Sequence, residues 1–78
     1  MKTMTCKQLG GACNEVFHAE TFEQMAELSK QHGMKMFQIG DEAHLQAMDQ
    51  MKVLMENPGA MNQWMDEKRK EFANLADD

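Results

Sequence analysis

The sequence predicts an α+β domain in which a small N-terminal β-hairpin is followed by three α-helices. Side chains of residues 2–6 alternate between two faces, a Gly10-Gly11 pair lets the chain reverse, and apolar residues then recur every three or four positions. A chain of 78 residues buries only about 60 to 65% of its unfolded surface, so we expect a single domain, residues 1–78, with one small core. The expected bounds are residues 2–19 for the hairpin and 22–38, 42–56 and 58–75 for the helices.

Both cysteines flank the turn of the predicted hairpin. The segment CKQLGGAC has Cys6 and Cys13 on either side of the two glycines, which adopt backbone angles that other residues avoid. Residues 15–19 then return as the second strand. Because a two-stranded hairpin is only marginally stable in water, we expect a helix to cover one of its faces or its edge to pair with another chain.

The first helix has a clear beginning. Thr21 and Gln24 have the spacing of a capping box, so the helix is expected to begin at Phe22. Gly33 either ends it early or is accommodated at about 1 kcal/mol relative to alanine, and Gly40 is the stronger end signal. Its predicted inward stripe consists of Phe22, Met25, Leu28, His32 and Met36.

The second and third helices are separated by Pro58. Asp41 is a favourable N-cap for the second helix, Pro58 stops it, and Asn57 can cap the third. Ten methionines fill the place of scarce aromatic residues, because their unbranched side chains adapt to irregular gaps. The stripe of the second helix is His44, Met48, Met51 and Met55; that of the third is Met61, Trp64, Met65, Phe72 and Leu75.

The composition argues against several classes of protein. Thirteen acidic and eight basic residues give a formal net charge of −5, which repels a phosphate backbone, so nucleic acid is not an expected partner. Neither a signal peptide nor a run of about 18 apolar residues is present, so we expect a cytoplasmic protein that does not enter membranes. In a reducing compartment the cysteines are expected to be thiols or metal ligands rather than a permanent disulfide.

The cysteine pair has three interpretations: part of a metal site, a reversible disulfide, or two buried thiols. A closed zinc site needs about four ligands, so other residues must contribute. His32 is the best placed because its helix folds back over the hairpin, and His18 and His44 are further candidates. A satisfied interior histidine is an equally good interpretation of His32.

The motif CKQLGGAC, followed by Val16-Phe17, by TFEQ from Thr21 and by His32, resembles a bacterial family of unknown function, numbered 1059, over about residues 4–37. Members of that family are described as predicted small metal-binding proteins. The resemblance implies that Cys6, Cys13 and His32 are metal ligands. The family has a second histidine five residues after the first, where this chain has Phe37, so a fourth ligand would come from His18, His44, an acidic residue or water.

These observations lead to a non-enzymatic metal-binding protein as the first hypothesis, with zinc as the expected metal. The histidine and methionine stripe of the second helix has ligands suited to copper(I), although methionines at this spacing more often form a core or a partner groove. The second hypothesis is a module that binds a copy of itself, as a homodimer, or another protein, and the third is a thiol redox sensor. The residues proposed for partner binding are Met48, Met51, Met55, Met61, Trp64 and Met65.

Overall fold

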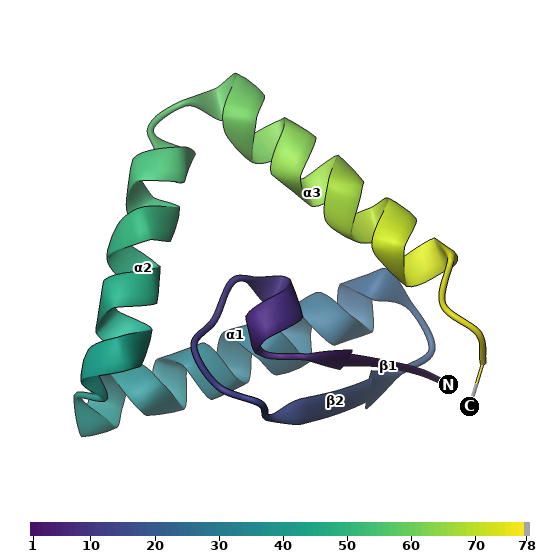
Figure 1. Cartoon of the computed structure of the whole chain (residues 1–78), viewed down its shortest axis with the longest axis horizontal. Helices are drawn as coiled ribbons and strands as arrows, with labels where there is room; N and C mark the ends of the chain where they lie inside the picture. Colours follow the sequence, from purple (N-terminus) through teal and green to yellow (C-terminus); the bar gives the residue numbers. More distant parts are fainter. Residues whose placement is uncertain (78) are drawn as a thin grey trace.

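A computed structural model describes residues 1–77 and has the predicted α+β architecture (Figure 1). Strands β1 and β2 form an antiparallel hairpin in which Met4 lies opposite Phe17. A short 3₁₀ helix, η1, follows β1, and three α-helices follow the hairpin. The bounds are Lys2–Thr5 for β1, Lys7–Leu9 for η1, Val16–Ala19 for β2, Phe22–Ile39 for α1, Glu42–Met55 for α2 and Pro58–Ala73 for α3.

The helix ends follow the capping residues in the sequence. The Thr21 hydroxyl accepts a hydrogen bond from the Gln24 amide at the start of α1, and the helix continues through Gly33 to a left-handed Gly40. Asp41 and Asn57 cap α2 and α3 in the same way. Local sequence therefore determines where each helix begins.

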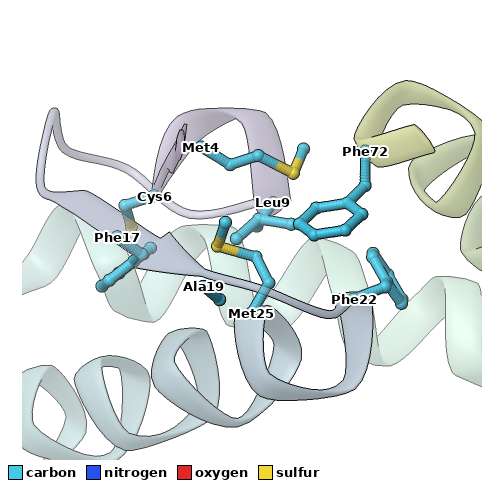
Figure 2. Packing of buried hydrophobic residues seen from close by; sticks show 8 residues of the cluster. All are labelled: Met4, Cys6, Leu9, Phe17, Ala19, Phe22, Met25 and Phe72. Carbon is cyan, nitrogen blue, oxygen red and sulfur yellow. The ribbon is translucent and has the colours of Figure 1, made fainter. Parts of the chain in front are cut away.

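The core lies between the hairpin, α1 and the end of α3 (Figure 2). Met4 and Met25 are its most deeply buried side chains, 1% and 0% exposed, so methionine does take the central positions. Phe72 from α3 packs edge-on against Phe22, with the two ring centroids 6.0 Å apart. The buried apolar residues are Met4, Cys6, Leu9, Phe17, Ala19, Phe22, Met25 and Phe72.

The three helices form an open triangle with the hairpin packed on α1 (Figure 1). The Lys2 ammonium donates to the Phe72 and Ala73 carbonyl oxygens, each at 3.1 Å, and so ties the first strand to the end of α3. Helix α2 forms the side of the triangle between the end of α1 and the start of α3. It contributes no side chain to the apolar core, and its only buried residue is His44. None of the helices in residues 1–77 has the length and apolarity required to cross a bilayer.

Candidate metal centre

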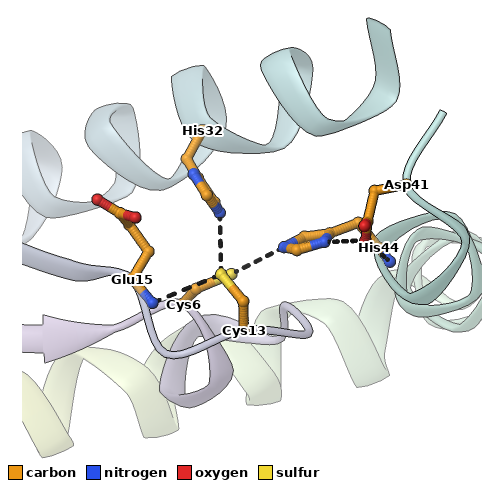
Figure 3. Close-up of polar contacts among 6 residues, drawn as sticks. All are labelled: Cys6, Cys13, Glu15, His32, Asp41 and His44. Carbon is orange, nitrogen blue, oxygen red and sulfur yellow. Dashed lines mark hydrogen bonds and ion pairs between the residues drawn. The ribbon is translucent and has the colours of Figure 1, made fainter. Parts of the chain in front are cut away.

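Four side chains from separate segments converge beside the loop that contains Gly10 and Gly11, called the glycine loop below (Figure 3). Cys6 precedes η1, Cys13 lies in the loop before β2, His32 is in the middle of α1, and His44 is in the first turn of α2. One ligand atom from each lies within 4.8 Å of those from the other three. The expectation that Cys6, Cys13 and His32 meet is confirmed, and of the two additional candidates the structure adds His44.

The glycine loop wraps closely around the Cys6 sulfur. Gly10 adopts a left-handed conformation with φ of 91°, and the Gly11 amide donates to the Cys6 carbonyl at 2.8 Å. A β-carbon on Gly11 would lie 2.1 Å from the Cys6 Sγ. Position 11 therefore has no room for a side chain, which is a tighter constraint than the reversal of the chain alone.

Backbone hydrogen bonds fix the two cysteines relative to each other. The Cys6 amide donates to the Glu15 carbonyl at 2.8 Å and the Lys7 amide to the Cys13 carbonyl at 3.1 Å. The predicted first strand included Cys6, but β1 ends at Thr5 because the chain turns into η1. The Cys6 side chain is buried, with only 3% of its surface exposed.

Both sulfur atoms accept hydrogen bonds from backbone amides. Burial raises the pKa of the Cys6 thiol, and the amides of Cys13 and Ala12, which hydrogen-bond to that sulfur, partly oppose the rise. The Glu15 amide donates to the Cys13 Sγ at 3.5 Å. Such donors favour the negatively charged thiolate, the form in which cysteine binds a metal. Both cysteines are free.

His32 approaches from α1, and two other aromatic rings contact its imidazole. Its Nε2 lies 3.2 Å from the Cys13 Sγ. The rings of Phe17 and His44 contact it edge-on, with centroids 5.5 and 5.3 Å away. In this arrangement the imidazole packs against both rings while its Nε2 faces the sulfur.

His44 is oriented by Asp41, one turn earlier. The Asp41 Oδ2 accepts from the His44 amide at 3.0 Å and lies 2.5 Å from the His44 Nδ1. The hydrogen bond from the His44 ring lowers the pKa of the Asp41 carboxyl. With the proton on Nδ1, the Nε2 lone pair faces the Cys6 Sγ, 3.6 Å away. Histidine ligands of metals are commonly held by a carboxylate in this manner.

The spacing of these atoms fits a tetrahedral metal ion. Bonds of about 2.0 to 2.3 Å in a tetrahedral zinc site place neighbouring ligand atoms about 3.3 to 3.8 Å apart. The two nitrogen-to-sulfur distances, 3.6 and 3.2 Å, lie in or next to this range. No two of the four ligand atoms are more than 4.8 Å apart. Each of them therefore needs to move by less than about 1 Å to reach the spacing of a tetrahedral zinc site. The four residues could therefore hold a metal ion.

The remaining residues that the sequence analysis named do not belong to the group of four ligands. His18 is exposed on β2, with its Nδ1 2.9 Å from the Thr3 hydroxyl. Phe37 is 65% exposed on α1. Trp64 covers Gly10, Met65 packs against the core, Met61 is half-buried, and Met48, Met51 and Met55 line a cavity next to the four ligands.

Asp41 was expected only as a helix cap. An aspartate three residues before a histidine at a helix start can both cap the helix and bind the imidazole, so the sequence does contain a signal for its second role.

Comparison of the chain with family models, with curated proteins and with solved structures finds no match. The resemblance to family 1059 therefore stays a prediction.

Proposed function

We propose that the protein is a small, non-enzymatic zinc-binding protein whose ligands are Cys6, Cys13, His32 and His44. The observation that supports this most is the convergence of four ligand atoms within 4.8 Å. Two thiolates and two imidazoles in a tetrahedral arrangement suit zinc. Four protein ligands leave no open coordination position, which is typical of structural rather than catalytic zinc.

Metal content tests this proposal directly. The protein, purified without a metal-affinity tag, is expected to contain about one zinc ion per chain, as in other closed four-ligand sites. A variant with Cys6→Ala and Cys13→Ala should lose it, whereas His18→Ala, which removes a histidine outside the group, should retain it. Equal and negligible zinc in all three proteins would refute the proposal.

The substitution Asp41→Asn is expected to weaken zinc binding by roughly tenfold to hundredfold, the usual effect of removing the carboxylate behind a histidine ligand. Asparagine is also a good N-cap, so α2 should still begin at Glu42. Competition with a chromogenic chelator measures the affinity, and circular dichroism checks the helix content. Unchanged affinity would mean that Asp41 is only a cap.

Zinc affinity is expected to fall steeply as the pH is lowered, because both thiols and both imidazoles must lose their protons to bind. Titration calorimetry in buffers of different ionisation enthalpy should detect proton release on zinc binding.

The stability of the zinc-free protein is expected to depend on pH in the opposite direction, because burial raises the pKa of the Cys6 thiol. The folded state retains the Cys6 proton to a higher pH than the unfolded chain does, so the free energy of unfolding should decline as the pH rises above 9.0, the ordinary thiol value.

Self-association is a second candidate function, supported by the shape of the molecule. The radius of gyration is 12.5 Å and the thinnest dimension 15 Å, whereas a compact chain of this length has a radius of about 11.5 Å. The accessible surface is 5412 Å², and a 9.0 kDa monomer is expected to have about 4,900 Å². The excess surface favours a second copy as a covering layer.

The surface proposed for this contact is formed by Met34, Phe37 and Met48, which line a hollow of about 350 Å³ between α1 and α2. Met34 and Phe37 are 55% and 65% exposed. Sedimentation at micromolar concentration should give a dimer, and Phe37→Lys should convert it to a monomer while Gln31→Lys, on the same helix, should not. A native chain that sediments as a monomer would refute this second function and leave the zinc site unaffected.

A further inference from the structure

An open cavity of about 300 Å³ lies beside the four proposed metal ligands and is lined by residues of η1 and the glycines after it, of α1 and of α2. Cys6, His32 and His44 form one end of its wall. Apolar side chains form most of the rest, among them Leu9, Ala47, Met48, Met51 and Met55. This volume is at the lower end of the range for small-molecule sites, and the flexible methionines can adapt to ligands of different shape.

Lys52 is the only charged side chain on this wall apart from the proposed metal ligands. It is exposed, and it makes no ion pair with any residue in the described part of the chain. The wall contains no carboxylate. An anionic group at this position would gain a charge-assisted hydrogen bond without displacing an existing partner.

The cavity follows α2 from the metal end to the lysine. His44 and Lys52 are eight residues apart on this helix, which at 1.5 Å per residue corresponds to about 12 Å, roughly the length of a ten-carbon chain. At the inner end the His44 imidazole has the Cys6 sulfur as its partner, and the His32 imidazole has the Cys13 sulfur. An apolar tail is therefore suited to the inner end and an anionic head to the outer end.

From this arrangement we infer that the cavity binds a medium-chain aliphatic carboxylate. Its carboxylate pairs with Lys52, and its alkyl chain lies along Leu9, Met48 and Met51 toward the metal centre. The inference goes beyond zinc binding, because the ligand contacts the wall of the cavity and no metal coordination is required.

Decanoate is the probe, and Trp64 provides the readout. Trp64 is the only tryptophan, and its ring would lie 3.2 Å from a β-carbon on Gly10, a residue of the cavity wall. Titration of the full chain with decanoate should change its fluorescence with saturation, and calorimetry should give about one site per chain. Decylamine, with the opposite charge, should bind at least about tenfold more weakly.

Two variants separate the contribution of the charge from that of the apolar wall. Lys52→Met should weaken decanoate binding about tenfold and leave 1-decanol binding unchanged, whereas Met48→Glu should abolish binding of both. Lys30→Met, which removes an exposed lysine of α1 outside the cavity wall, is the control. Absence of saturable decanoate binding, or equal binding of decanoate and decylamine, would overturn the inference. Zinc measured in the same samples reports separately on the proposed function.

Discussion

Removal of zinc is expected to lower the melting temperature by roughly 15 to 30 °C and to release α2 from the rest of the protein. A metal present at about a thousand times its dissociation constant stabilises the folded state by about 4 kcal/mol, and each kcal/mol corresponds to about 4 to 8 °C for a domain of this size. Helix α2 should be affected most, because His44 is its only buried residue.

Hydrogen exchange can locate this effect. Amides of α2 should lose most of their protection in the presence of a chelator, whereas those of β1, β2 and the first half of α1, which surround the apolar core, should lose much less. Helix α3 keeps Phe72 in the core and its bonds to Lys2, so its last turns should also stay protected. The variant with Cys6→Ala and Cys13→Ala should show no response to chelator. Equal protection of α2 with and without zinc would mean that apolar contacts alone hold it.

Much of this fold could be predicted because its signals are local. The Thr21 cap, the helix starts after Asp41 and Asn57, and the end at Gly40 all act within one helical turn. The 3₁₀ turn η1 was missed although it also has a local signal. The Thr5 hydroxyl accepts from the Gln8 amide, and the Gln8 side chain accepts from the Thr5 amide, which is the reciprocal pattern of a capping box.

The site could be predicted only in part. Cys6 and Cys13 share one loop, and His32 lies on the stripe of the helix that covers it, so the sequence limits their separation. His44 and His18 could not be distinguished in the same way. The choice depends on the angle at which α2 leaves α1 and on the face of the hairpin that α1 covers, and both result from packing between distant residues.

The substitution Gly11→Ala is expected to weaken zinc binding by roughly fivefold to a hundredfold. The new methyl group would lie 2.1 Å from the Cys6 Sγ and 3.0 Å from the Cys6 carbonyl oxygen. The backbone cannot easily shift to make room, because the Gly11 amide donates a hydrogen bond to that same carbonyl oxygen. Overpacking in a tight interior costs about 1 to 3 kcal/mol, and each 1.4 kcal/mol is about tenfold in affinity. Chelator competition measures the loss.

The matched control is Gly59→Ala in the first turn of α3. A β-carbon there meets only the Asn57 side chain, at the ordinary contact distance of 3.5 Å, and alanine favours a helix over glycine by up to about 1 kcal/mol. This variant should keep full zinc affinity and melt slightly higher. If Gly11→Ala also binds zinc with native affinity, the Cys6 sulfur must be free to move aside, and the loop then does not hold it in position for the metal. Loss of zinc in Gly11→Ala alone would mean that the absence of a side chain at position 11 is what allows Cys6 to act as a ligand.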